Sequence, residues 1–150
     1  MLSREMQERL VEAAFAAKTN AYSPYSNFPV GAALLCTDGT IVKGASIDNA
    51  SHSETICAER TAIVKAVSEG NRSFAALAVV ANVPHISPCG LCRQVIVEFC
   101  APEMLVLLIP GDYPASGGKL KETTVGELFP EHDNYLGGGS ASRRGAHFTT

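Results

Sequence analysis

The chain has 150 residues, a net charge of −3, 46% hydrophobic residues and 18% charged residues. This length suits one domain with a buried core, and the composition is that of a globular protein rather than a disordered one. Because the charge is spread along the chain without a basic run, a nucleic-acid-binding surface is not expected. No apolar stretch is long enough to cross a membrane, and the charged start lacks the apolar core of a signal peptide.

The first half of the chain has the pattern of a helix, a hairpin and a second helix. Ser3 can cap a helix whose apolar residues fall on one face, namely Met6, Leu10, Val11, Ala14 and Phe15. A loop over 19–31, rich in proline, serine and asparagine, precedes two β-like runs that an Asp38-Gly39 turn joins into a hairpin. Residues 54–70 have helical spacing, and Gly70 is placed to end that helix.

The second half alternates strands and helices. Residues 74–83 and 104–110 are nearly continuous apolar runs, as expected of strands that are covered on both faces. Between them, residues 87–100 are predicted to form a helix with Ser87 as its N-cap, Pro88 in its first turn and two cysteines close to its start.

A polar loop then leads to a short strand near Leu120 and a last short helix, which Thr124 and Glu127 introduce with a capping-box pattern. The resulting order α-β-β-α-β-α-β-β-α predicts an α/β fold, a three-layer α-β-α sandwich around a mixed sheet of about five strands. We expect a single domain over residues 1–136 and a flexible C-terminal tail, rich in glycine and serine, over 137–150.

Three of the five cysteines stand at the predicted starts of two helices. The odd number and the spacing do not suit a secreted disulfide framework, so we expect a cytoplasmic protein in which clustered cysteines bind metal or do chemistry. Cys89 and Cys92 share one helix face, and Cys57 has the equivalent place in the other long helix. If the two helix N-termini face each other, three thiolates can hold zinc and leave a fourth position for water, as in a catalytic site.

Glu59 and Arg60 follow Cys57 closely and suit such a centre. A carboxylate beside the metal but not bound to it can take a proton from the water and pass it to a leaving group, which is a role for Glu59. Three thiolates around Zn²⁺ leave a net negative charge, and the Arg60 guanidinium could offset it by donating to a thiolate. Arg93 either assists Arg60 or is an ordinary surface charge.

The order Cys57-Ala58-Glu59 followed by Pro88-Cys89-Gly90-Leu91-Cys92 resembles the signature of the zinc nucleoside deaminases. The stretches SPYSNFPVGAALL, CAERTAIVKAVSEG, SPCGLCRQV and GELFP extend the resemblance over most of residues 20–130, and they are similar to the small-subunit form of the cytidine deaminase family. The resemblance implies the fold of that family and the hydrolytic deamination of cytidine or 2′-deoxycytidine to the uridine product and ammonia, in pyrimidine salvage. It also implies zinc as the cofactor, a cytosine nucleoside as the partner, and a homotetramer whose active sites borrow residues across subunits.

The same resemblance implies roles for single residues. Zinc would be held by Cys57, Cys89 and Cys92, and Glu59 would shuttle the proton. The expected substrate-binding residues are Phe28, against the pyrimidine, and Ala58, Ser46, Asp48 and His52.

Two segments depart from the family pattern. The family has Asn-x-Glu after the second strand, whose side chains grip the ribose hydroxyls, whereas this chain has Ser46-Ile47-Asp48. The shorter side chains should change which sugar is accepted, since a site built to bond a hydroxyl discriminates steeply. His52, Ser53 and Glu54 stand where the family tends to have an aromatic and apolar residues. We expect His52 to line the sugar end of the pocket, in its own or a neighbouring subunit, and Ser53 to be a neutral surface change.

A structural zinc domain is one alternative that the sequence leaves open. His52, His85 or Cys100 would then close the site as a fourth ligand, but Glu59 would have no role. More ordinary places are expected for these residues: Cys36 and Cys100 as small buried apolar residues, and His85 in a solvated loop.

Two further alternatives concern chemistry. A thiol–disulfide oxidoreductase that uses Cys89 and Cys92 gives Cys57 no task. A deaminase of a modified cytosine nucleoside, such as the antibiotic blasticidin S, would share the mechanism and differ in substrate.

Overall fold

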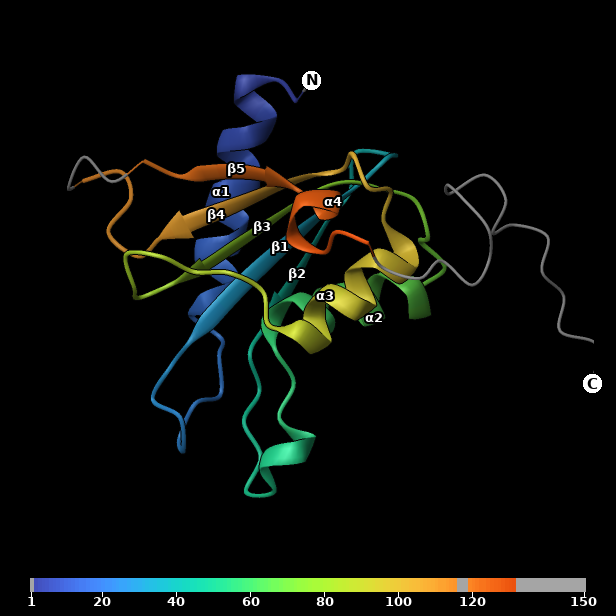
Figure 1. Ribbon diagram of the computed structural model, residues 1–150. Coiled ribbons are helices and arrows are strands. Elements are labelled where there is room, and N and C mark those ends of the chain that lie inside the picture. The colour runs from blue at the N-terminus through green and yellow to red at the C-terminus, as the bar shows by residue number, and fades with distance from the viewer. Residues whose placement is uncertain (1, 116–118, 132–150) are drawn as a thin grey trace, which may run out of the picture.

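The computed structural model describes residues 2–115 and 119–131, which form one five-stranded sheet with helices on both faces (Figure 1). The elements in chain order are α1 (Arg4–Lys18), β1 (Val30–Cys36), β2 (Ile41–Ala45), η1 (His52–Glu54), α2 (Ala58–Ser68), β3 (Phe74–Ala81), α3 (Gly90–Phe99), β4 (Leu105–Pro110), β5 (Lys121–Thr124) and α4 (Val125–Leu128). This order confirms the predicted one, with the 3₁₀ turn η1 added. The expected domain end at residue 136 and the expected tail over 137–150 lie outside the described residues. In the described part of the chain, no helix is both long and apolar enough to cross a membrane.

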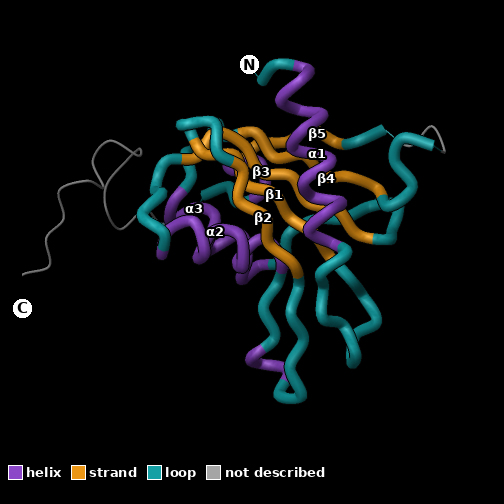
Figure 2. Tube along the Cα trace, turned by 180° about the vertical axis from the view of Figure 1, so that it is seen from behind, coloured by secondary structure: helices purple, strands orange, loops and turns teal. Residues whose placement is uncertain are grey.

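The sheet is mixed, with the strand order β2-β1-β3-β4-β5. β3 and β4 run parallel, and the other neighbouring strands of this sheet run antiparallel. α1 covers one face and α2 and α3 cover the other, as the two opposite views show (Figure 1, Figure 2). Alternate residues of β1 serve the two layers: Ala33 and Leu35 pack on the α1 side, and Ala32 and Leu34 pack on the other side. The predicted three-layer sandwich is therefore confirmed.

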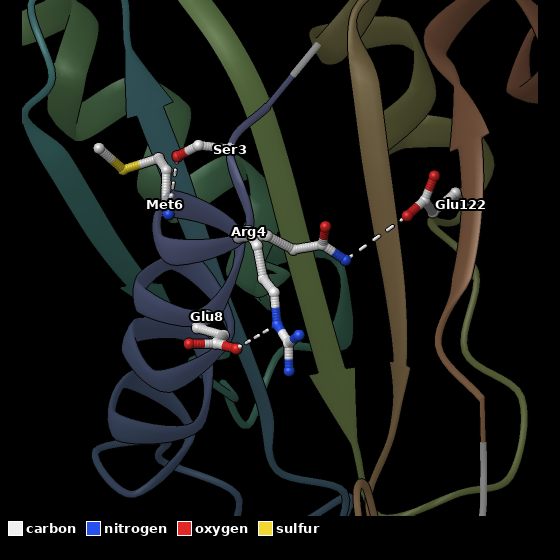
Figure 3. Close-up of polar contacts among 6 residues, drawn as sticks. Ser3, Arg4, Met6, Glu8 and Glu122 are labelled. Atoms are coloured by element: carbon white, nitrogen blue, oxygen red, sulfur yellow. Dashed lines mark hydrogen bonds and ion pairs between the residues drawn. The ribbon is translucent and has the colours of Figure 1, made fainter.

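α1 is anchored at its start by polar contacts (Figure 3). The Ser3 hydroxyl oxygen accepts a backbone N–H from the first turn at 3.2 Å, which confirms the predicted cap. Arg4 pairs with Glu8 one turn further on, at 3.0 Å, on the exposed face. The Gln7 amide donates to the Glu122 carboxylate of β5 at 3.5 Å, so the first turn of α1 is tied to an edge strand of the sheet.

Two glycines with positive φ end their elements where the sequence predicts. Gly39, with φ of 88°, lies in the turn of the β1–β2 hairpin. Gly70, with φ of 95°, follows the end of α2. Its N–H bonds to the Val67 carbonyl at 3.1 Å, and the Asn71 N–H bonds to the Ala66 carbonyl at 2.9 Å. This pair of bonds is a Schellman motif, which satisfies carbonyls that the end of a helix leaves open.

α2 and α3 begin later than the sequence predicted, and each begins directly after a cysteine. Cys57 is the N-cap of α2, because the preceding Ile56 is held extended by two backbone hydrogen bonds of 2.9 Å to Ile47. Cys89 is the N-cap of α3, so the predicted cap at Ser87 and a first turn at the following proline are wrong. An arginine in the first turn of α3 binds that stretch and keeps it outside the helix.

The segments that carry the predicted site residues are gathered at one edge of the sheet. β1 begins where β3 ends, with Val30 paired to Ala81, and β2 ends at the same edge. Two segments project from it (Figure 1, Figure 2): residues 22–28, here called the aromatic loop, and residues 46–56, here called the arm, with η1 at its tip. α2 follows the arm and α3 follows β3, so both helices start at this edge.

Gly44 of β2 lets α2 lie directly on the sheet. An added Cβ at this position would lie 2.4 Å from the Ala62 nitrogen and 2.5 Å from the Ala58 carbonyl oxygen. We therefore expect Gly44→Ala to lower the free energy of unfolding in urea by ~1–3 kcal/mol, the usual cost of overpacking a core. Lys43→Ala, an exposed neighbour on the same strand, is the control and should change it by less than about 0.5 kcal/mol. Equal losses in the two variants would contradict this packing.

Candidate active site

Three cysteine thiols meet at the N-termini of α2 and α3. The Sγ atoms of Cys57 and Cys89 are 3.9 Å apart, those of Cys89 and Cys92 are 3.5 Å apart, and all three lie within 4.8 Å of one another. Sulfur ligands at about 2.3 Å from a tetrahedral zinc lie roughly 3.8 Å from each other, so the thiols fit zinc as they stand. Both Cys57 and Cys89 are N-caps, and for Cys57 the positive end of α2 also favours the thiolate form.

The side chains considered as a fourth ligand lie elsewhere. Within residues 2–115 and 119–131, no further histidine, cysteine or carboxylate joins this group. Cys100 is buried at the opposite end of α3, and His52 and His85 are exposed outside the cluster. Cys36 is buried in β1, so the two remaining cysteines are buried apolar residues, as predicted. Three ligands with a position left open suit a catalytic zinc better than a structural one.

The Glu59 carboxyl lies beside the cysteine cluster and is only 4% exposed. Its Oε2 is 3.8 Å from the Sγ of Cys92. Burial raises the pKa of Glu59 to about 7, because a carboxylate loses hydration inside the protein. Near neutral pH this carboxyl can therefore both accept and release a proton.

Hydrogen bonds distribute the charge of the cluster. A hydrogen bond from the Cys92 thiol, together with the Arg60 guanidinium, lowers the pKa of Cys57 to about 5. The same hydrogen bond raises the pKa of Cys92 well above its usual range. Arg60 donates from Nη2 to the Cys57 sulfur at 3.6 Å and to the Thr55 carbonyl at 3.4 Å. The guanidinium thus faces a thiolate, which is the place that its proposed electrostatic role requires.

The expected substrate-binding residues differ in burial. Phe28 is exposed on the aromatic loop, and His52–Glu54 are exposed at the tip of the arm. Ala58 is fully buried, so it can present only its backbone to a ligand. Ser46 and Asp48 are each 6% exposed, and their side chains bind the segment of chain that contains the aromatic loop and the start of β1. The sequence did not predict these internal contacts.

Arg93 makes three hydrogen bonds that sequence reasoning missed. It donates to the Pro88 carbonyl at 2.8 Å, to the Ser87 hydroxyl at 2.9 Å and to the Leu128 carbonyl of α4 at 2.6 Å. Arg93 is therefore a structural tie rather than a second donor to the thiolates or a free surface charge. It holds the residues before Cys89 outside α3. No local pattern could reveal this, since Leu128 is 35 residues further along the chain.

Similarity to known proteins agrees with this geometry. Residues 4–108 match the family described as the cytidine and deoxycytidylate deaminase zinc-binding region. The chain belongs to this deaminase family. A cytidine deaminase of Sporosarcina psychrophila is 54% identical over 126 residues, which cover 82% of this chain and 88% of that protein. The crystal structure of cytidine deaminase from Burkholderia pseudomallei is 42% identical and has a TM-score of 0.77, covering 87% of this chain and 98% of that one. A blasticidin-S deaminase of Bacillus cereus is 34% identical over 110 residues, covering 67% of this chain and 74% of that protein.

Membership of the deaminase family decides between the alternatives that the sequence left open. The family region is a zinc-binding one, and the three-thiol cluster fits that metal, so zinc is the cofactor. A thiol–disulfide oxidoreductase is excluded because the chain belongs to the deaminase family. A purely structural zinc domain is excluded because the matching family is one of deaminases.

We expect one zinc ion per chain in protein that is purified without added metal. Cys89→Ala removes one of three thiolates and should bring the zinc content close to zero, because two ligands hold the metal weakly. Cys100→Ala removes a buried thiol outside the cluster and should retain the full content. Elemental analysis of the three proteins measures this. Full zinc content in Cys89→Ala would show that the metal is bound elsewhere.

Proposed function

We propose that the protein is a zinc-dependent cytidine deaminase, which hydrolyses cytidine and 2′-deoxycytidine to uridine and 2′-deoxyuridine with release of ammonia. The observation that carries the proposal is the buried Glu59 carboxyl beside three thiols that leave one zinc position open. The high identity to cytidine deaminases over most of both chains supports the same substrate class.

Glu59 moves the protons of this reaction. Cys57, Cys89 and Cys92 would hold the zinc ion, which would act as the Lewis acid that makes a water molecule acidic enough to react at neutral pH. Glu59 takes the proton that the water loses and donates it to ring N3 as the new C–O bond forms at C4. It then carries the remaining hydroxyl proton to the amino nitrogen, the C–N bond breaks and ammonia leaves. A pKa of about 7 suits a group that accepts and donates in each turnover.

The nucleoside pocket is formed by the aromatic loop and the arm, beside the zinc site. In this proposal Phe28 packs against the pyrimidine and the backbone of Ala58 faces the base. Ser46, Asp48 and His52 shape the sugar end. Support comes from the placement of both segments at the edge of the sheet where α2 and α3 begin.

A modified cytosine nucleoside is the second candidate substrate. The resemblance implies Asn and Glu where this chain has the shorter Ser46 and Asp48, which favours a change in the accepted sugar. The similarity to a blasticidin-S deaminase supports the same chemistry on such a compound. The higher identity to cytidine deaminases ranks this candidate second.

Exposed apolar side chains around the site support a homotetramer. Large apolar residues with 39–67% exposure lie on the aromatic loop, on the arm and at the start of α3, namely Tyr22, Tyr25, Phe28, Ile47, Ile56 and Leu91. A cluster of this kind is typical of a surface that another subunit covers. We propose that four copies associate through it and complete one another's pockets. The absence of a disulfide among the five cysteines, all of which lie in the described residues, supports a cytoplasmic location, where the enzyme would serve pyrimidine salvage.

Glu59→Gln tests the function most directly. The variant keeps the size of the side chain but cannot transfer protons, so we expect kcat to fall by ~10⁴-fold, the upper end of general acid–base contributions. Zinc content should be unchanged. Activity is followed by the loss of the cytosine absorption band with cytidine, 2′-deoxycytidine and blasticidin S. We expect the unmodified protein to prefer the first two. Near-normal kcat in the variant would show that the protons travel by another route.

Light scattering at micromolar concentration tests the assembly. We expect a tetramer, and we expect Leu91→Glu to shift it toward smaller species, because the substitution places a charge on an exposed apolar position. Glu12→Lys, an exposed change on α1 at the opposite face of the sheet, is the control and should leave the mass unchanged. A fully active monomer would contradict the proposal.

A further inference from the structure

The side chains of Ser46 and Asp48 are buried, and both bind the protein's own chain. We propose that Asp48 is a positioning residue whose carboxylate holds the aromatic loop in the shape that presents Phe28 to the substrate, while Ser46 fixes the start of the following strand. The inference rests on the proposed function for the role of Phe28. It replaces a direct grip of Asp48 on the sugar hydroxyls with contacts inside the protein.

The buried Asp48 carboxylate accepts hydrogen bonds from the aromatic loop on both of its oxygens. Oδ2 accepts the backbone N–H of Ser26 at 2.8 Å and that of Tyr25 at 3.2 Å, and Oδ1 accepts the Ser26 hydroxyl at 3.1 Å. The backbone bond from Ser26 is the main cause that lowers the pKa of Asp48. The carboxylate therefore stays ionised, and its bonds are charge-assisted. Three donors on one buried charge make Asp48 part of the structure of the loop.

Ser26 transmits this hold to Phe28. The Ser26 hydroxyl oxygen accepts the Phe28 N–H at 3.2 Å while its hydrogen is donated to Asp48. Between these residues, Asn27 has a positive φ of 51°, a conformation that asparagine adopts more readily than most residues. Its N–H bonds to the Ser23 carbonyl at 3.0 Å, which closes the turn. The position of Phe28 is thus set by Asp48 through Ser26.

Residues 46–48 also connect the aromatic loop to the metal site. On one side, Tyr22 exchanges backbone hydrogen bonds of 3.0 and 2.8 Å with residues 46 and 48. On the other side, Ile47 exchanges two bonds of 2.9 Å with Ile56, and Cys57 follows directly. The aromatic loop and the segment that leads into the cysteine cluster are therefore both bound to residues 46–48 by backbone hydrogen bonds. A change at residue 48 would alter the position of the loop relative to the cluster.

Short side chains suit this arrangement. The Ser46 hydroxyl oxygen accepts the N–H of Val30, the first residue of β1, at 2.9 Å. The Asp48 oxygens already meet backbone donors at hydrogen-bond distance, so one more methylene would carry a carboxylate past them. The consequence for specificity is that the contribution of Asp48 to binding does not depend on a sugar hydroxyl.

The test compares substrates with and without the 2′- and 3′-hydroxyls of the sugar. KM and kcat are measured for cytidine and for 2′,3′-dideoxycytidine, which lacks both ring hydroxyls. We expect Asp48→Ala to raise KM by about 10-fold for both substrates, the size expected when hydrogen bonds to a charged group are lost, with little change in kcat. Ser26→Ala, which removes only the hydroxyl relay, should raise KM for both substrates by a smaller factor. Amide hydrogen exchange at Tyr25, Ser26 and Phe28 should accelerate in Asp48→Ala.

Asp38→Ala is the matched control. Asp38 is exposed, and its carboxylate likewise accepts a backbone N–H, that of Thr40 at 2.9 Å, in the distant β1–β2 turn. Its loss should accelerate exchange at Thr40 and leave KM unchanged. A KM increase in Asp48→Ala for cytidine alone would overturn the proposal and identify a hydroxyl ligand. If Asp48→Ala does not fold, Ser26→Ala is the test. A KM increase for both substrates would support the proposal, and an unchanged KM for both would overturn it. An unmodified protein without activity would refute the proposed function, whereas the exchange measurement still tests the hold on the loop.

Discussion

Three thiol groups held within 4.8 Å of one another are the constraint around which this protein is arranged. As thiolates they repel, and the repulsion is offset by the N-termini of α2 and α3, by the Arg60 guanidinium and by a divalent cation when it is bound. Both helices must then start with a cysteine at one edge of the sheet. The parallel pair β3–β4 with its crossover helix α3, and the arm that leads into α2, meet that requirement.

Small residues place the buried Glu59 carboxyl. α2 lies on β2 without space for a Cβ at Gly44, so its first turn is fixed against the sheet. Ala58 turns into that contact, and the next residue, Glu59, is buried beside the thiols. Burying a carboxyl in this way is unfavourable when it is ionised. The same burial raises the pKa of Glu59 into the range where the carboxyl can exchange protons at neutral pH. The burial that lowers the stability of the protein is therefore also what suits Glu59 to its proposed role.

Features that depend on nearby residues could be predicted from the sequence. The Asp38-Gly39 hairpin, the end of α2 at Gly70 and the Thr124–Glu127 capping box are all present, because each is set by conformational preferences within a few residues. The grouping of the three cysteines also follows from their spacing, once two helices are assumed to start at one edge.

Features that depend on distant contacts could not be predicted. The sequence pattern predicts starts of α2 and α3 that are too early. The backbone hydrogen bonds between Ile47 and Ile56 set the start of α2, and the hydrogen bonds of Arg93 set the start of α3. The internal contacts of Asp48 could not be predicted for the same reason, since its partner Ser26 is 22 residues away.

Arg93 makes the shape of the cysteine cluster depend on a part of the chain that contributes none of its three thiols. A natural or engineered form that ends before Val125 would lose the Leu128 carbonyl that Arg93 binds. Its zinc affinity would then weaken although every ligand is intact, so variation in the C-terminal region can alter metal retention from outside the coordination sphere.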